Sequence, residues 1–505
     1  MASAARVRLG DDRRVEGMVE DGVAVFRGIP YAAAPVGADR FAPPRPATWT
    51  GTWDARRAGP TAPQPTMDLS HVPGAPDLTA VRGPGWLPGD DYLNLNVWTP
   101  DPGAAGLPVM VFVHGGSFTG GTGAAPVHDG TRFAQDGVVL VTVNYRLGVP
   151  GFLHLPDAPD NRGLRDQLAA LEWVREHVAA FGGDPDNVTV FGESAGALSV
   201  GALLAAAPAG LFRRAVSQSG GASHAFSRGQ ARLVTAAVAD RLGVPGTAAG
   251  LAGIPDEKLV AALAGLAAAP LDLAVDGLRD PMMGMSKVGP VVDGDLLHAQ
   301  PVDVVAAGAA GGVDLLVGSN SDEMNLYLVM LSAAPVTEDA LRTAVAALHP
   351  DPERLVAVYR EAGRGATPGE LLSAIGTDYM FAVPTARLAD AHAAVSGGRT
   401  WRYEFTWPSP VADGRLGACH TLELPFVFDA VGRVDYGAFG VREEDEAVRA
   451  LARDTHAAWV SFGRDGDPGW ARYTPGSPTV QYVGPEWRTT RRADGPERSL
   501  WEEVR

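Results

Sequence analysis

One stretch of the chain decides the fold: residues 188–207 read VTVFGESAGALSVGALLAAA. The apolar run at 188–191 predicts a buried strand, and the run of small and apolar residues after Gly196 predicts a helix. Between them, G-E-S-A-G has the G-x-S-x-G pattern of a nucleophile elbow, with Ser194 at the apex of a tight turn. The flanking glycines remove Cβ atoms that would clash with a strained serine backbone. The alternative is a Gly/Ser turn without chemistry.

A serine hydroxyl is almost entirely protonated at neutral pH, so Ser194 would need a base, an orienting acid and an oxyanion hole. An apolar strand-like run, VMVFV at 109–113, leads directly into HGGSF at 114–118. The glycine pair lets backbone N–H groups turn toward a substrate oxygen, and the N–H of Ala195 is a further candidate donor. His114 lies too close to such a hole to be the base, and we expect its ring to shape the loop.

The base is expected late in the chain. The histidines after Ser194 are His224, His298, His349, His392, His420 and His456. His392 and His456 lie within helical patterns, for which an amphipathic surface is the ordinary explanation. His420 follows the strand-like run 400–407 and a loop, where an imidazole can reach a serine on another strand. Position therefore favours His420.

The orienting acid is expected after another strand. Residues 313–318, VDLLVG, predict a strand, and SNSDE at 319–323 follows its carboxyl end. Either Asp322 or Glu323 could accept a hydrogen bond from the imidazole Nδ1. The residues alone leave this choice open.

Further blocks occur along the chain in a recognisable order: FRGIPYA at 26–32, RFAPP at 40–44, DDYLNLNV at 90–97, NYRLG at 144–148, DQ at 166–167, FGGDP at 181–185, QSG at 218–220 and VDG at 292–294. With the elbow, they resemble the type-B carboxylesterase/lipase family nearly from end to end. Its bacterial para-nitrobenzyl esterase-like members are the most similar in character. The resemblance implies an α/β-hydrolase fold and a serine esterase that works through an acyl-enzyme.

The resemblance also implies a site. In the family pattern the acid is the Glu of an Asp-Glu pair, and the base is a His three residues before a Glu that precedes a Pro-Phe run. The predicted catalytic residues are Ser194, Glu323 and His420, the predicted oxyanion-hole donors are Gly116, Ser117 and Ala195, and the predicted supporting residues are Ser219, Glu193 and Glu423. Ser219 matches a serine that hydrogen-bonds near the triad in the family, and a purely structural hydroxyl is its alternative.

Two positions depart from the family pattern. Ser117 stands where a third glycine is usual, so its side chain must point away while its N–H serves the hole. Tyr92 replaces a cysteine, and Cys419 is the only cysteine in the chain, so no intramolecular disulfide can form. The animal members are secreted and disulfide-stapled, and this chain is expected to differ from them.

Composition limits the choice of partners and location. The net charge of −17 over 505 residues argues against nucleic acid and anionic membranes. The N-terminal residues contain no apolar signal-like run, and no apolar stretch is long enough to span a bilayer. We expect a cytoplasmic enzyme that is a monomer or a weak homo-oligomer and acts on a small-molecule ester.

The coarse pattern predicts an α/β fold with a large, mostly parallel central sheet flanked by helices. Residues 138–143 form a continuous apolar run, and apolar residues at helical spacing over 164–181 predict a helix stopped by Gly182. No linker, repeat or charge block divides the chain, so residues 1–505 are predicted to form one domain. Helical insertions are expected at roughly 222–287 and 337–394, over the active-site cleft. The Pro-rich residues 60–89 are expected to be a surface loop.

The substrate is less well defined. Met282, Met283 and Met285 could form a flexible acyl pocket, and Phe118, Trp86 and Phe381 are candidate cleft aromatics. No metal-ligand spacing, P-loop or dinucleotide fingerprint occurs, so no metal or cofactor is implied. Two other functions remain open: an acyltransferase or lactone-forming enzyme with the same triad, and a non-catalytic binding protein on this fold.

Overall fold

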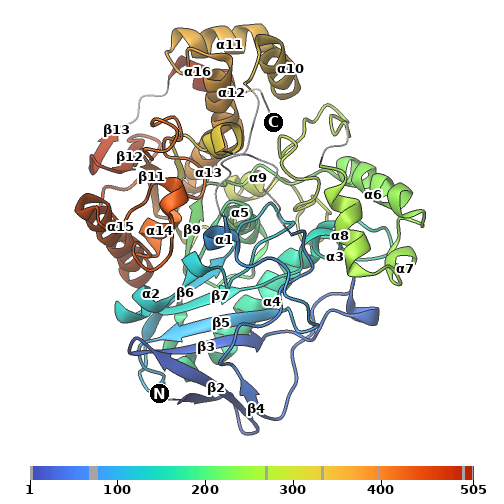
Figure 1. Ribbon diagram of the computed structural model, residues 1–505, viewed down its shortest axis with the longest axis vertical. Helices are drawn as coiled ribbons and strands as arrows, with labels where there is room; N and C mark the ends of the chain where they lie inside the picture. Colours follow the sequence, from blue (N-terminus) through green and yellow to red (C-terminus); the bar gives the residue numbers. More distant parts are fainter. Residues whose placement is uncertain are drawn as a thin grey trace.

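A 13-stranded mixed sheet runs through the molecule (Figure 1). The computed structural model describes residues 4–66, 78–267, 271–330, 335–395, 397–491, 495–502 and 504. The strands are β1 Ala4–Arg8, β2 Arg13–Glu20, β3 Val23–Pro30, β4 Gly51–Asp54, β5 Asn94–Thr99, β6 Leu107–Val113, β7 Val139–Val143, β8 Gly183–Glu193, β9 Arg214–Gln218, β10 Asp314–Asn320, β11 Thr400–Phe405, β12 Thr479–Val483 and β13 Arg488–Arg491.

The strand order is β1-β2-β3-β5-β7-β6-β8-β9-β10-β11-β12-β13, and β4 pairs with β2. Every neighbouring pair from β7 to β12 is parallel, as predicted for the centre of the sheet. Antiparallel pairs extend the sheet at both ends: β1, β2, β3 and β5 on one side, and β13 on the other. The carboxyl ends of the parallel strands share one edge, which is where such sheets place their sites.

Helices cover both faces of the sheet. They are α1 Thr79–Arg82, α2 Thr131–Gln135, α3 Gly148–Phe152, α4 Arg162–His177, α5 Ala195–Ala206, α6 Arg228–Leu242, α7 Ala248–Leu251, α8 Asp256–Ala264, α9 Pro301–Ala306, α10 Glu338–Leu348, α11 Pro352–Glu361, α12 Pro368–Thr377, α13 Val383–Ala394, α14 Leu424–Val427, α15 Glu446–Asp465 and α16 Pro496–Ser499. Short 3₁₀ turns are η1 Gly37–Asp39, η2 Pro126–His128, η3 Val178–Phe181 and η6 Gly437–Phe439, and π-helical turns are η4 Leu326–Met330 and η5 Asp378–Ala382.

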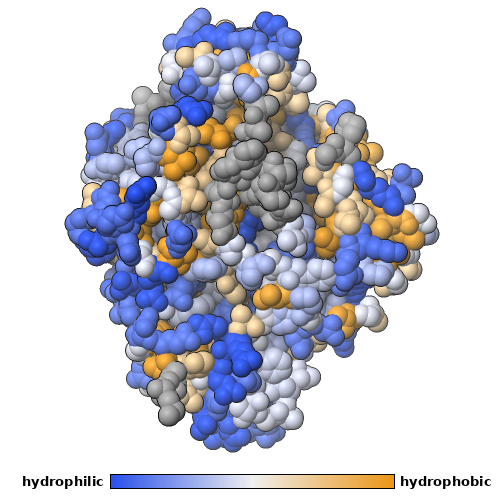
Figure 2. Space-filling model, viewed as in Figure 1, coloured by the Kyte–Doolittle hydropathy of each residue, from blue (hydrophilic) through white to orange (hydrophobic). Residues whose placement is uncertain are grey.

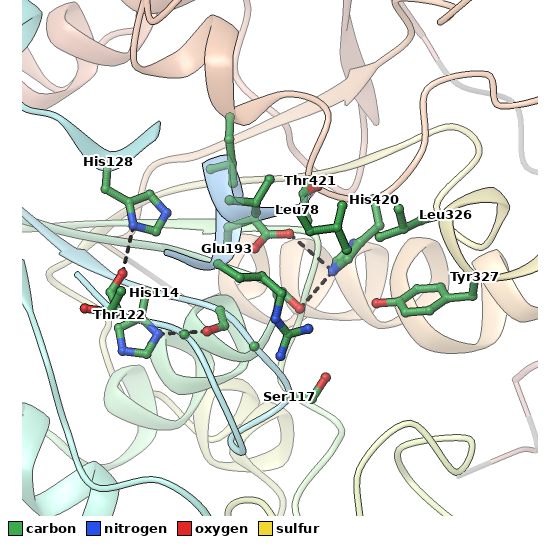
Figure 3. Close-up of a pocket in the computed structure, with 17 residues that line it drawn as sticks. Leu78, His114, Ser117, Thr122, His128, Glu193, Leu326, Tyr327, His420 and Thr421 are labelled. Carbon is green, nitrogen blue, oxygen red and sulfur yellow. Dashed lines mark hydrogen bonds and ion pairs between the residues drawn. The ribbon is translucent and has the colours of Figure 1, made fainter. Parts of the chain in front are cut away.

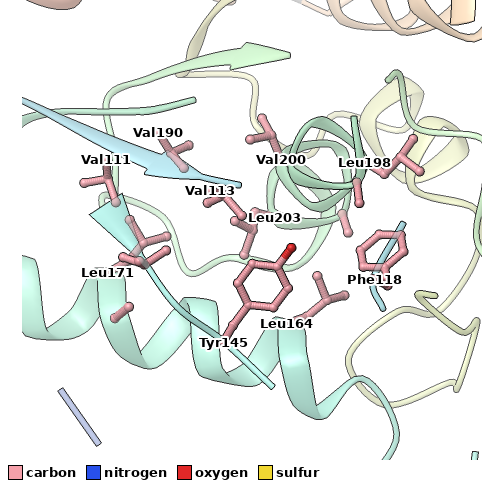
Figure 4. Packing of buried hydrophobic residues seen from close by; sticks show 14 of the residues in the cluster. Val111, Val113, Phe118, Tyr145, Leu164, Leu171, Val190, Leu198, Val200 and Leu203 are labelled. Atoms are coloured by element: carbon pink, nitrogen blue, oxygen red, sulfur yellow. The ribbon is translucent and has the colours of Figure 1, made fainter. Parts of the chain in front are cut away.

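Side chains of the central strands are buried on both faces, which explains their continuous apolar runs. In β6, Val109, Val111 and Val113 belong to one core cluster, whereas Met110 and Phe112 belong to a second cluster on the opposite face. The first cluster packs against α4 and α5, and the second packs against α15. Figure 4 shows the first layer, in which strand valines face leucines of α4 and α5.

Local signals set the ends of these helices. The η3 turn after α4 ends at Gly182, whose φ of 86° is a left-handed conformation that glycine adopts without a steric penalty. Helix α5 is buried almost all round, so it lacks the polar stripe of a surface helix. Capping boxes begin α6 at Ser227 and α12 at Thr367.

The two regions expected as insertions contain α6–α8 and α10–α13. In Figure 1, α6–α8 lie at one side of the molecule, and α10–α12 lie with α16 at the end opposite the N-terminal strands. Helices α10–α12 have a core cluster of their own. Hydrophilic residues predominate on the face drawn in Figure 2, and apolar ones occur there in small groups. The division into one domain with two insertions stays a prediction.

Candidate active site

Four strand ends bring the predicted site residues together. The oxyanion-hole loop follows β6, Ser194 follows β8, Glu323 follows β10, and His420 lies on the long segment after β11. Strands β6, β8, β9, β10 and β11 are consecutive neighbours in the sheet. Parallel pairing of these strands therefore brings segments that are more than 200 residues apart in the sequence to the same edge of the sheet.

The turn at Ser194 has the strained geometry that the pentapeptide predicts. Ser194 has φ 57° and ψ −123°, and its N–H donates to the Gln218 carbonyl at 2.9 Å. A Cβ at Gly196 would lie 1.9 Å from the Val113 carbonyl oxygen, and one at Gly192 would lie 2.8 Å from the same atom. Both glycines are needed because β6 passes directly against the elbow.

Ser194, His420 and Glu323 form a continuous chain of polar contacts. His420 Nε2 lies 2.8 Å from Ser194 Oγ, and His420 Nδ1 lies 2.6 Å from Glu323 Oε2. Glu323 and His420 are almost completely buried. The arrangement is consistent with a ring whose Nδ1–H donates to Glu323 and whose Nε2 accepts from the serine.

The carboxylate that faces His420 belongs to Glu323. Its other oxygen, Oε1, accepts from the Asn320 backbone N–H at 2.8 Å, which fixes the carboxylate plane. Asp322 turns to a different loop, where its Oδ2 accepts from the Ala418 N–H at 3.1 Å. Of the two candidate acids, Glu323 is therefore the one that lies beside the imidazole.

The loop after β6 is fixed by hydrogen bonds that two of its backbone carbonyl groups accept. Tyr145 Oη donates to the His114 carbonyl at 2.7 Å, and Ser286 Oγ donates to the Ser117 carbonyl at 2.8 Å. Gly116 and Ser117 both have positive φ, 116° and 57°. Ser117 thus adopts a left-handed backbone conformation, which glycine takes more easily than other residues.

The N–H groups of this loop remain available. Among the described residues, no protein acceptor receives a hydrogen bond from the N–H of Gly116, Ser117 or Ala195. Gly116 and Ser117 line the same cavity as Ser194, and Ala195 directly follows the serine. Three N–H groups without a protein acceptor beside Ser194 match the arrangement that binds an oxyanion.

Glu193 is a second carboxyl beside the imidazole. Its Oε1 lies 3.2 Å from His420 Nε2, and it has no hydrogen-bond partner among the described residues. Burial raises the pKa of Glu193 to about 8; the charge of His420 opposes this rise, and the carboxylates of Glu423 and Glu323 add to it. Glu193 therefore holds a proton more readily than an exposed glutamate.

The pKa of His420 is shifted by opposing effects. Burial lowers it, but the carboxylates of Glu193 and Glu323 favour the charged ring more strongly, and together they raise the pKa to about 9. The carboxylates of Glu193 and Glu323 thus stabilise the protonated form of the His420 ring.

Behind the triad, Glu423 joins three elements of the site. It accepts from Asn320 Nδ2 at 2.8 Å and from Gln218 Nε2 at 3.2 Å. Asn320 also donates through Nδ2 to the Cys419 carbonyl at 2.7 Å, next to the base. We did not predict roles for Asn320 and Gln218; their positions at the ends of β10 and β9 were the only signal in the sequence.

The cavity at Ser194 has a volume of about 80 Å³. Figure 3 shows Glu193, Ser117, His420 and Tyr327 around it. Part of its wall is Leu78, Val81 and Arg82, which belong to or precede the short helix α1.

The prediction of a surface loop at 60–89 fits residues 84–89, which form neither helix nor strand and are mostly exposed. It was wrong for residues 61–64, which are buried, and for 79–82, which form α1 and contribute to the cavity wall. Proline and glycine indicate an irregular backbone, but their presence does not show whether that backbone packs against the cavity at Ser194. Residues 67–77 lie outside the described part of the chain.

The predicted supporting serine and the candidate substrate-pocket residues lie outside the contact chain from Ser194 to Glu323. Ser219 is fully buried with φ 58°, yet its Oγ has no hydrogen-bond partner among the described residues, so it is not bonded to the triad. Phe381 packs on the His420 ring, with centroids 4.8 Å apart. Phe118, Trp86 and the three methionines at 282, 283 and 285 do not line the cavity at Ser194, and Met282 is buried in the main core.

The surface interpretation of His392 and His456 was wrong. Both lie in helices as expected, but their rings are buried. His392 Nδ1 contacts Thr400 Oγ1 at 2.9 Å, and His456 Nδ1 contacts the Val427 carbonyl at 2.7 Å. Each buried ring has a polar partner, Thr400 Oγ1 for His392 and the Val427 carbonyl for His456, which lowers the cost of burying it.

His114 shapes the loop, as expected. Its Nδ1 lies 2.8 Å from the Gly115 carbonyl, and its ring stacks on Tyr145 at 4.5 Å. Within the described ranges, no group of three or more His, Cys, Asp and Glu side chains could hold a metal ion. No helix in the same ranges is long and apolar enough to cross a membrane.

Comparison with known proteins identifies the family. The carboxylesterase family model matches residues 5–498. The chain is 38% identical to para-nitrobenzyl esterase of Bacillus subtilis (strain 168) over 469 residues, covering 90% of this chain and 89% of the relative. It is 33% identical to phenmedipham hydrolase of Pseudarthrobacter oxydans over 490 residues, covering 93% of each.

Solved structures agree. A carboxylesterase of Geobacillus stearothermophilus at pH 6.2 has a TM-score of 0.83 at 37% identity, covering 99% of this chain and 100% of its own. A PNB esterase has a TM-score of 0.81 at 33% identity, covering 98% and 99%. The fold is therefore the α/β-hydrolase fold, as predicted. The chain belongs to the carboxylesterase family and is a carboxylic ester hydrolase.

Proposed function

We propose that this protein is a serine carboxylesterase that hydrolyses small-molecule carboxylic esters through a Ser194–His420–Glu323 triad. The observation that carries the proposal is the unbroken contact chain from Glu323 Oε2 to His420 to Ser194 Oγ, at 2.6 and 2.8 Å. Family membership supports ester hydrolysis as the reaction. The assignment of roles to individual residues is our inference from geometry.

In the first half-reaction, Ser194 Oγ attacks the ester carbonyl carbon while His420 Nε2 takes the hydroxyl proton. Glu323 accepts from Nδ1–H and stabilises the imidazolium. The oxyanion receives hydrogen bonds from the free N–H groups of the oxyanion-hole loop and of Ala195. As the C–O bond breaks, the alcohol leaves with the proton from Nε2, and the acyl group remains on Ser194.

In the second half-reaction, water attacks the acyl carbonyl and gives a proton to His420. The tetrahedral species uses the same donors, and its collapse returns that proton to Ser194 Oγ as the acid departs. Water has to reach the acyl group for this step, which separates hydrolysis from acyl transfer or lactone formation by the same triad. No observation favours transfer over hydrolysis.

Substitution of Ser194 tests the proposal. Ser194→Ala removes only the hydroxyl, so the protein should fold while turnover of an aryl ester falls by several powers of ten. Circular dichroism and thermal unfolding check the fold. Activity near wild type in a folded variant would reject Ser194 as the nucleophile. Location in the cytoplasm and a monomeric or weakly associated state remain predictions.

A further inference from the structure

An arginine is part of the cavity wall beside the proposed nucleophile. Arg82 is the last residue of α1 and lines the cavity together with Ser194, Gly116 and Ser117. A cavity of about 80 Å³ is small, so its lining groups face a common space. Arg82 thus lines the same cavity that the ester carbonyl attacked by Ser194 would enter.

The Arg82 guanidinium has no protein partner in the part of the chain that the structure describes: none of those residues forms a hydrogen bond or an ion pair with it. Two other buried arginines have protein partners: Arg146 binds the Asp166 carboxylate at 2.7 Å, and Arg162 donates to the Pro150 carbonyl at 2.7 Å. No Arg82 nitrogen is among the fully buried polar atoms that lack a partner, so the guanidinium keeps access to open space at the cavity. A partly buried guanidinium without a protein partner is unusual, because such groups are normally paired.

The nearby acid forms no ion pair with Arg82. The charge of Glu193 acts on Arg82, but its carboxyl contacts His420 Nε2 at 3.2 Å, and no ion pair joins it to Arg82 among the described residues. A guanidinium keeps its proton at neutral pH. The chain as a whole carries a net charge of −17, so an anionic substrate needs a local cation to be held here.

We propose that Arg82 is a specificity residue that binds a free carboxylate of the ester substrate, which makes short esters with a carboxylate near the scissile bond the preferred class. The planar fork of the guanidinium matches a carboxylate through two parallel hydrogen bonds. The inference rests on the proposed ester hydrolysis. It adds a substrate class that neutral aryl esters would not reveal.

Matched pairs of esters test this directly. Monoethyl succinate and monoethyl glutarate carry the carboxylate on the acyl side, and acetoxyacetate carries it on the alcohol side. The neutral controls of the same shape are ethyl succinamate, ethyl glutaramate and acetoxyacetamide, in which an amide replaces the carboxylate. The ratio of kcat/KM for each acid to that for its amide is measured by product quantification at pH 7.5.

The wild-type enzyme should prefer at least one acid over its amide, and Arg82→Gln should lower that ratio by about 10- to 100-fold. Arg82→Lys should keep part of the preference, because the charge remains but the fork is lost. Arg56→Gln is the matched control for net charge, since Arg56 is exposed and bonded to Asp54; it should leave the ratio unchanged.

Two results would overturn the inference. One is a wild-type ratio at or below one for every pair. The other is an equal loss for acid and amide in Arg82→Gln, which would make Arg82 a counter-charge for Glu193. Failure of the proposed function is distinguishable, because then neither the acids nor the amides would be hydrolysed by the wild-type enzyme.

Discussion

Glu193 Oε1 lies 3.2 Å from His420 Nε2, the same ring nitrogen that lies 2.8 Å from Ser194 Oγ. The proposed base therefore faces the nucleophile and a carboxyl group at once. A negative Glu193 favours the protonated ring, which cannot accept the serine proton. The protonation state of His420 Nε2 should therefore set the pH range in which the site is active.

The pH profile follows from this relationship. An ordinary histidine would make the hydrolysis rate rise between roughly pH 5 and 8. Because the pKa of His420 is raised to about 9, the neutral imidazole that can accept a proton appears only as pH increases, and the rise should be centred above that range. Glu193→Gln removes a charge that raises the pKa of His420, so its kcat/KM profile should move to lower pH by about one unit. A profile that stays in place or moves to higher pH would exclude this role for Glu193.

The two adjacent acids should differ sharply in effect. Glu323→Gln should lower kcat by about four powers of ten, as the corresponding change does in another serine triad, because the amide favours the wrong imidazole tautomer. Asp322→Asn is the matched control, since Asp322 binds the Ala418 N–H and not the imidazole. It should cost less than tenfold. Steady-state kinetics on an aryl ester compares them, and reversed effects would move the orienting role to Asp322.

Cys419 should be dispensable although it adjoins the base. Its side chain is fully buried, and burial raises the pKa of the thiol well above its usual range, so little reactive thiolate exists. Cys419→Ser should keep most activity, and iodoacetamide should inhibit the wild type weakly. A Cys419→Ser variant as inactive as Ser194→Ala would require a thiol-dependent mechanism instead.

The centre of the fold was predictable because its strands are buried on both faces. Continuous apolar runs such as 109–113 and 188–191 leave little choice of structure. The antiparallel strands at the N-terminal edge were not predicted, since segments such as β2, RRVEGMVE, carry charged residues on a partly exposed face. These segments form strands because they pair with neighbouring strands, and the periodicity of hydrophobic residues in the sequence does not reveal that pairing.

The site was predictable in part. The elbow pattern led to Ser194 from the residues alone, whereas the choice of Glu323 over Asp322 needed the family resemblance. The contacts of Asn320 and Gln218 with Glu423 were not foreseen, because they depend on which strands lie side by side. Arg82 was missed because the Pro- and Gly-rich composition around it indicates a loop and says nothing of what that loop covers.

The central claim is that the acyl group passes through Ser194, and trapping that intermediate tests it most directly. The wild-type enzyme is mixed with 4-nitrophenyl acetate, quenched in acid within the first turnover, digested and analysed by mass spectrometry. Our account predicts one acetyl group on the peptide containing Ser194, and none on that peptide in Ser194→Ala. An acetyl group on another residue, or complete turnover with water in Ser194→Ala, would contradict it.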